Sequence, residues 1–175
     1  MGWESISLNG LVIQTGETAV SLKTEVKTSL YETDYSLWLE QILAQLTVGD
    51  FTNIDLENLI EEIQDLGKSE KHAVASYLMR LCEHLLKVKY WNSEGENCLR
   101  GWELEIANFR IQIHRKLKSS PSLKNYLEEK FSEEYVNAKK LFLKASGLEA
   151  TLIPEQPCFS LEEALDEDWL PKHQG

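Results

Sequence analysis

Apolar residues recur at intervals of three and four positions through most of the chain, starting at Tyr31. This spacing places them along one face of an α-helix, and each such face needs another surface to bury it. Five stretches follow the pattern, which predicts five amphipathic helices joined by short links. The expected fold class is therefore all-α, a helical bundle of about five helices.

The first two predicted helices lie before residue 67. One covers residues 35–46 and is capped by Asp34, whereas the other starts after Asp55 and ends at Gly67, because glycine commonly follows a helix C-terminus. The side chains expected to face inward are Trp38, Leu39, Ile42, Leu43 and Leu46 in the first helix, and Leu56, Leu59, Ile60, Ile63 and Leu66 in the second.

The other three predicted helices cover residues 69–90, 99–117 and 123–145. Residues 92–97 consist of turn-forming types and separate the first two of these helices. Gly147 is expected to end the last helix. Ser119 and Ser120, followed by Pro121, are expected to supply its N-terminal cap.

The two ends of the chain follow different patterns. Apolar and polar residues alternate over residues 5–14 on both sides of an Asn-Gly pair. Residues 1–30 are therefore predicted to form a short β-hairpin or a flexible extension. Residues 148–175 hold three of the four prolines and predict an extended C-terminal strap. The predicted organisation is thus an N-terminal extension, residues 1–30, and a single helical-bundle domain, residues 31–175.

Two features of the strap are predicted in more detail. Ser160 and Glu163 have the spacing of a capping box, which indicates one short helical turn over residues 160–165. Trp169 and Leu170 are expected to anchor the end of the strap on the bundle.

The charge and the cysteines restrict the class of function. A net charge of −11 disfavours general binding to nucleic acid or to anionic membranes, because phosphate binding needs clustered cations. The charge is uneven, since residues 68–118 hold ten Lys and Arg against six Asp and Glu. The three cysteines are widely spaced, and there is neither a membrane-spanning apolar run nor a signal-peptide pattern. These features predict a soluble, cytoplasmic protein.

Several segments also match a known family in order. They are Tyr31-Glu32-Thr33-Asp34-Tyr35, Trp38-Leu39, Leu56-Glu57-Asn58-Leu59-Ile60-Glu61-Glu62-Ile63, Leu66-Gly67-Lys68-Ser69-Glu70, His84-Leu85-Leu86-Lys87, Trp102, Arg110, Ser120-Pro121-Ser122-Leu123, Tyr135, Ala138 and Leu165-Asp166-Glu167-Asp168-Trp169-Leu170-Pro171. Here the chain resembles a bacterial family, abundant in cyanobacteria, known as domain of unknown function, family 29. The resemblance implies a helical bundle and brings no activity, cofactor or catalytic residue with it.

A small set of polar residues stands beside the predicted apolar stripes. Such positions can hold a ligand, or can pair within the bundle. In particular, Arg110 is expected at the rim of its helix, where it could pair with Glu62 or Glu70. The candidate polar cluster consists of Glu62, Glu70, His84, Lys87 and Arg110.

Two Arg/His pairs provide an alternative hypothesis. Arg80 precedes His84 by four positions, and Arg110 precedes His114 by the same interval, so each pair shares a helix face. This arrangement resembles the HEPN class of helical ribonucleases, although three intervening residues are fewer than that class usually has. A weaker alternative is a metal-binding bundle around Glu62 and His84, but the chain has no Glu-x-x-His motif.

The leading hypothesis is a non-catalytic interaction or regulatory module. No catalytic signature or phosphate-binding loop is present, and no cofactor or metal is assigned. A protein partner is expected, a homo-oligomer is compatible with the sequence, and no membrane association is expected.

Overall fold

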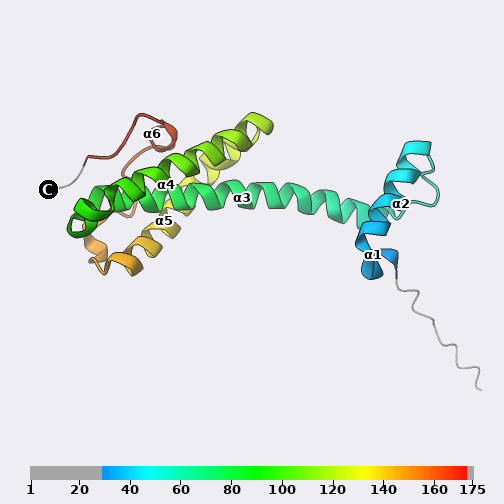
Figure 1. Cartoon of the computed structure of the whole chain (residues 1–175), viewed down its shortest axis with the longest axis horizontal. Helices are drawn as coiled ribbons and strands as arrows, with labels where there is room; N and C mark the ends of the chain where they lie inside the picture. The colour runs from blue at the N-terminus through cyan, green and yellow to red at the C-terminus, as the bar shows by residue number, and fades with distance from the viewer. Residues whose placement is uncertain (1–28, 173–175) are drawn as a thin grey trace, which may run out of the picture. The chain divides into compact units, whose positions relative to one another are not determined.

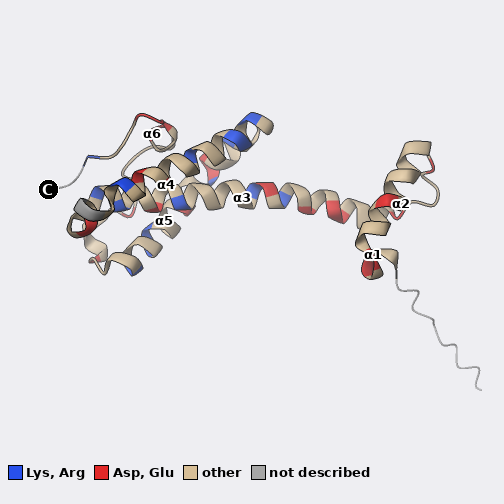
Figure 2. Cartoon of the chain, in the orientation of Figure 1, with Lys and Arg blue, Asp and Glu red and all other residues tan. Residues whose placement is uncertain are grey.

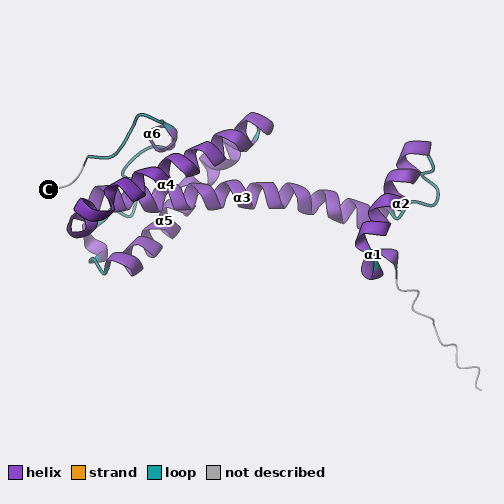
Figure 3. Ribbon diagram, viewed as in Figure 1, coloured by secondary structure: helices purple, strands orange, loops and turns teal. Residues whose placement is uncertain are grey.

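The structure, a computed structural model, describes residues 29–172, except for the side chains of Glu96 and Asn97. The described residues form helices joined by loops and contain no strand, so the all-α prediction is confirmed (Figure 3). The hairpin predicted for residues 1–30 falls almost wholly outside the described residues. Contacts divide the chain into two compact units, Met1–Ile54 and Asp55–Gly175. The single domain expected over residues 31–175 stays a prediction.

The first unit contains α1 (Leu30–Thr33) and α2 (Tyr35–Val48), as Figure 1 shows. The Asp34 carboxylate caps α2 by accepting a hydrogen bond from the backbone N–H of Leu37 at 3.0 Å. Trp38 and Ile42 are buried, as expected. The inward prediction was wrong for three residues, which are 42–66 % exposed: Leu39, Leu43 and Leu46.

The second unit is built on three long helices. They are α3 (Leu56–Tyr90), α4 (Asn92–Ser119) and α5 (Leu123–Ser146), followed by η1 (Ala150–Leu152) and α6 (Leu161–Leu165) in the strap. Helix α3 packs against both α4 and α5 and is the centre of the unit (Figure 1). The apolar core gathers buried residues from these helices and from the strap, including Leu78, Leu81, Leu85, Ile106, Ile113, Leu127, Tyr135, Phe142 and Phe159.

Gly67 does not end a helix, so the prediction of two helices before and after it was wrong. Helix α3 is continuous from Leu56 to Tyr90, and Gly67 does not take the positive φ angle of a C-terminal cap. The apolar stripe explains this, because it keeps its phase across the glycine from Ile63 and Leu66 to Val74. A bundle that buries Val74 and its successors therefore extends one helix through Gly67.

Replacing Gly67 by Ala is expected to stabilise the protein by about 0.5–1 kcal/mol, because alanine restricts the unfolded chain and favours helix. A Cβ at this position meets nothing within 4 Å. Gly147 is the matched control, since its φ of 68° is strained for any L side chain and Gly147→Ala should destabilise. Urea unfolding of both variants measures the difference. Equal effects of the two substitutions would contradict the continuous helix.

The turn predicted for residues 92–97 was also wrong, because α4 begins at Asn92. The corner between α3 and α4 is made by Trp91 alone. Its ring stacks on Trp102 with centroids 5.7 Å apart and meets the edge of Phe142 at 6.1 Å. Aromatic packing at one residue thus replaces the expected loop.

Helix α5 and the strap largely follow the sequence. Gly147 ends α5 with a φ of 68°, and the capping box of Ser160 and Glu163 is formed on α6. Trp169 packs against Phe159 with ring centroids 5.9 Å apart, which confirms it as an anchor. The expected cap of α5 was wrong, because its N-cap is Ser122 and makes no side-chain cap bond.

Within the second unit, the other elements do not bury the second predicted apolar face. We call it the α3 stripe: Leu56, Leu59, Ile60, Ile63 and Leu66. Leu59 is partly buried, and the other four side chains are 46–68 % exposed. The stripe lies on the N-terminal part of α3, which continues past α4 and α5 in Figure 1. The expectation that these side chains face a core within the bundle was therefore wrong.

Candidate functional site

Arg110 is the most deeply buried cationic side chain among the described residues and is only 3 % exposed. It lies on α4 and points to the strap. Its Nε donates to the Ala164 carbonyl oxygen at 2.9 Å, Nη2 donates to that of Trp169 at 2.7 Å, and Nη1 donates to that of Glu167 at 3.3 Å. One guanidinium thus satisfies one carbonyl in the last turn of α6 and two carbonyls beyond the end of this short helix.

His114, one turn further along α4, extends the same contact. Its Nε2 lies 3.1 Å from the Leu165 carbonyl oxygen, so the ring donates there when Nε2 carries the proton. Arg110 and His114 therefore fasten α6 and the following chain to α4. The pairing expected between Arg110 and Glu62 or Glu70 was wrong, because strap carbonyls occupy the guanidinium.

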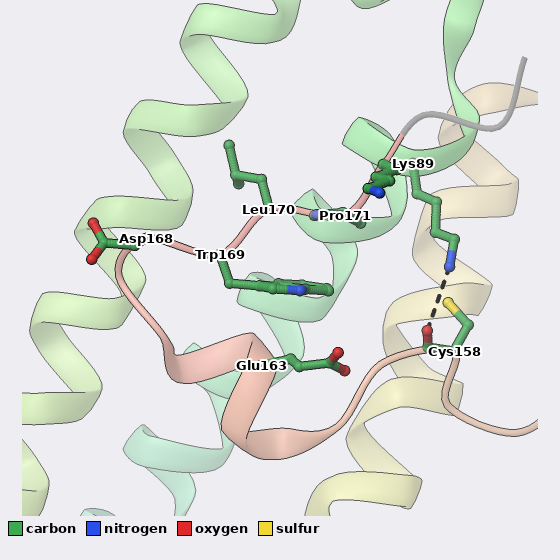
Figure 4. A pocket seen from close by; sticks show the side chains of 8 residues that line it. Lys89, Cys158, Glu163, Asp168, Trp169, Leu170 and Pro171 are labelled. Atoms are coloured by element: carbon green, nitrogen blue, oxygen red, sulfur yellow. Dashed lines mark hydrogen bonds between the residues drawn. The ribbon is translucent and has the colours of Figure 1, made fainter.

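A hollow of about 570 Å³ lies beside the strap. Figure 4 shows the Trp169 indole and the Glu163 side chain at its edge, opposite Lys89 from α3. The Lys89 ammonium donates to the Cys158 carbonyl oxygen at 3.4 Å, and Glu163 accepts from the Ser160 backbone N–H at 2.7 Å. The charged groups around this hollow are thus of both signs, and two of them, Lys89 and Glu163, are engaged in holding the strap.

A second polar group lies on α3 and is centred on Glu83, which is 5 % exposed. Its Oε2 accepts from Arg80 at 2.9 Å, and its Oε1 pairs with the Lys87 ammonium at 3.0 Å. Burial raises the pKa of this carboxyl, but hydrogen bonds from Arg80 and Lys87 outweigh burial and hold the pKa below its usual value. Glu83 was not among the sequence-based candidates.

His84 borders this group but faces α4. Its ring packs against Phe109 with centroids 5.5 Å apart, and its Nδ1 lies 2.9 Å from the Arg80 carbonyl oxygen. Burial lowers the pKa of His84, and the positive charge of Lys87 adds to the effect. The imidazole is therefore neutral at pH 7 and sits as a packed side chain.

Glu70 belongs to a third group, at the end of α4. Its Oε1 accepts from Lys116 at 3.0 Å and its Oε2 from the Ser120 hydroxyl at 3.1 Å. These two hydrogen bonds and the charge of Lys116 lower the pKa of Glu70. Glu62 lies two turns earlier on α3, next to the α3 stripe, and is partly buried.

The five members of the candidate polar cluster are thus not brought together. Glu70 and His84 lie fourteen positions apart on one continuous helix, which is about 21 Å of helix rise. Only His84 and Lys87 share a neighbourhood, around Glu83. The two Arg/His pairs are also separate in role, because one pair borders the Glu83 group and the other fastens the strap. The described residues give the ribonuclease hypothesis no support.

Two further searches cover the described residues only. No group of three His, Cys, Asp or Glu side chains gathers closely enough there to hold a metal ion. Among the helices described, none has both the length and the apolar composition that crossing a bilayer requires.

The second unit defines an all-α protein in which a C-terminal strap is fastened across long helices by one buried arginine. The chain belongs to the family described as Domain of unknown function DUF29, whose model matches residues 30–170. Comparison with curated proteins and with solved structures gives no match. The family membership confirms the resemblance that the sequence segments indicated.

Sequence reasoning missed two features of the surface and core. Glu83 carried a signal, because Arg80 and Lys87 stand three positions before it and four positions after it. No sequence signal indicated that the α3 stripe is exposed, because an apolar helical face has the same pattern whether its own chain or another surface covers it.

Proposed function

We propose that this protein is a non-catalytic interaction module that binds a partner helix through the α3 stripe. The observation that carries the proposal is the alignment of five apolar side chains over Leu56–Leu66, four of them 46–68 % exposed. Contiguous exposed apolar surface of this kind is typical of a binding site. Positions spaced by three and four residues fit another helix, which inserts its own side chains between them.

The contacts of the candidate catalytic residues support the same proposal. Arg110 and His114 are used by the strap, and Arg80 by Glu83. His84 packs on Phe109 with a lowered pKa that keeps it neutral. A general acid or base needs a free proton path to substrate, which these contacts do not favour. The three cysteines are free thiols, which supports a reducing, cytoplasmic setting as part of the proposal.

The proposal is tested by comparing three tagged full-length chains expressed in the source organism. Ile63→Asp puts a carboxylate in the middle of the α3 stripe, and Gln64→Asp puts the same group one residue away, off the stripe. We expect the wild type and Gln64→Asp to retain a stoichiometric polypeptide partner that Ile63→Asp loses. Equal recovery by all three chains argues against the stripe as the binding surface.

A measurement of turnover tests the non-catalytic part separately. Purified wild-type chain is expected to leave single-stranded RNA intact. RNA cleavage that His84→Ala or Arg110→Ala abolishes, in variants that stay folded by circular dichroism, would overturn this part of the proposal.

A further inference from the structure

We propose that the partner on the α3 stripe is a second copy of this chain, packed antiparallel about a two-fold axis near Glu61. The inference rests on the proposed function and names its partner. In this arrangement Leu56 of one copy lies opposite Leu66 of the other, and the same surface serves both copies.

The first argument is the continuity of the stripe with the core. Leu66, Glu70 and Val74 follow one another at intervals of four, so the α3 stripe and the buried face of α3 are one line along the helix. Helix α4 covers this line only as far as Glu70, where Lys116 and Ser120 meet the carboxylate. Leu56 lies about 21 Å beyond that point by helix rise. A second helix of this length extends the core where α4 stops.

The second argument is area. The exposed parts of the α3 stripe provide roughly 400 Å² of apolar surface on each copy, and interfaces are about 60 % apolar, so two copies bury about 1,300 Å² in total. Stable protein interfaces begin at about 1,200 Å². The stripe therefore provides just enough surface for a dimer of modest affinity.

The third argument is the charge at the two ends of the stripe, and it favours the antiparallel direction. The segment from Leu56 to Gly67 contains Glu57, Glu61, Glu62 and Asp65 and no lysine or arginine. Figure 2 shows acidic residues along this part of α3 and basic residues at the end of α4. Either direction brings the two acidic segments together, and in the antiparallel pair Glu57 lies opposite Asp65 of the other copy, so the choice of direction rests on the basic residues at the end of α4.

Antiparallel helices bring the first turn of α3 toward the end of α4 on the other copy, whereas parallel helices keep these two ends apart. Lys116 meets Glu70 in its own chain, so the last turn of α4 lies level with residues 67–70 of α3. Glu57 of the other copy reaches this level from the opposite direction and approaches Arg115 and Lys118, both of which are exposed. Acidic and basic ends thus face each other twice, once on each side of the axis.

The first experiment is sedimentation equilibrium of the full-length chain over a range of concentrations at low salt. We expect twice the 20.1 kDa of one chain for the wild type and for Gln64→Asp. Ile63→Asp should raise the dissociation constant about 100-fold, as the loss of a central apolar contact does. Ile63 is 63 % exposed in one copy, so this variant should keep its helical circular dichroism.

The second experiment tests the antiparallel direction by charge reversal. Lys118→Glu and Glu57→Lys should each raise the dissociation constant about threefold, since exposed ion pairs contribute little individually. The double variant should recover most of the wild-type affinity, because the two groups then attract again across the axis. Effects of the single variants that merely add in the double variant would overturn the antiparallel arrangement.

The outcomes separate this inference from the proposed function. A wild-type chain that stays monomeric overturns the inference, and so does a dimer that Ile63→Asp leaves intact. If the wild-type chain is a monomer but its tagged form retains a stoichiometric partner that the tagged Ile63→Asp chain loses, the proposed function stands and the partner is another protein. A dimer that Gln64→Asp dissociates as strongly as Ile63→Asp is held by net charge and also overturns the inference.

Discussion

Replacing Arg110 by Met should lower the free energy of unfolding by about 3 kcal/mol, because three carbonyls lose a charged donor at once. Methionine fills much of the space of the arginine stem but donates no hydrogen bond. The strap depends on this contact for its path after α6, since the carbonyls of Ala164, Glu167 and Trp169 converge on the one guanidinium. We therefore expect the strap to open before the helices unfold.

Urea unfolding followed by circular dichroism measures the global effect, and hydrogen exchange over residues 159–171 measures the opening of the strap. Arg100→Met is the matched control, because Arg100 is exposed on the same helix and should change stability by less than about 0.5 kcal/mol. Arg110→Lys should fall between them, because an ammonium cannot reproduce the planar fork of donors. Equal stability of the Arg110→Met and Arg100→Met variants would show that the strap is held by its apolar anchors instead.

The sequence predicted the type of each main element well and the boundaries of some elements poorly. Residues 123–145 were correctly expected as a helix ended by Gly147, because periodicity and capping residue agree there. The helix end predicted at Gly67 was wrong, because a glycine after an apolar run indicates a helix end only where the apolar stripe does not continue in phase beyond it. The turn expected at residues 92–97 failed for another reason, since packing of Trp91 on Trp102 overrides local turn propensity.

The candidate site was harder to predict than the fold. Arg110 was correctly singled out as a polar residue beside an apolar stripe. Its partners are backbone carbonyls of the strap, and no pattern of side chains predicts such partners. His84 and Lys87 were also singled out, whereas Glu83, which immediately precedes His84 in sequence and pairs with Lys87, was not. A helical wheel with one apolar face does not predict that Glu83 is buried. Helix α3 packs against two helices and therefore buries more of its circumference than one face.

Replacing Glu83 by Gln should destabilise the protein by about 2 kcal/mol at pH 7, because Lys87 then stays largely buried without its counter-charge. Glutamine keeps the shape of the side chain, so the loss reports charge and hydrogen bonding rather than a cavity. Glu133→Gln is the control, since Glu133 forms an ion pair with Lys130 at the surface and should contribute less than about 0.5 kcal/mol.

The difference in the free energy of unfolding between the wild type and Glu83→Gln should depend on pH, and this dependence is the more specific test. The folded-state pKa of Glu83 lies below its unfolded value, which is near 4.5, so the folded state binds its proton less readily. The stabilisation by the carboxylate is therefore fully present above that unfolded value and is lost as the pH falls through the folded-state pKa. Unfolding curves of wild type and Glu83→Gln should stay separated by a constant amount from pH 7 to about pH 5.5 and converge below pH 4.5. A separation that persists undiminished at pH 3 would mean that Glu83 acts through its packing, because protonation of the unfolded chain below about pH 4.5 progressively removes the contribution of the charge.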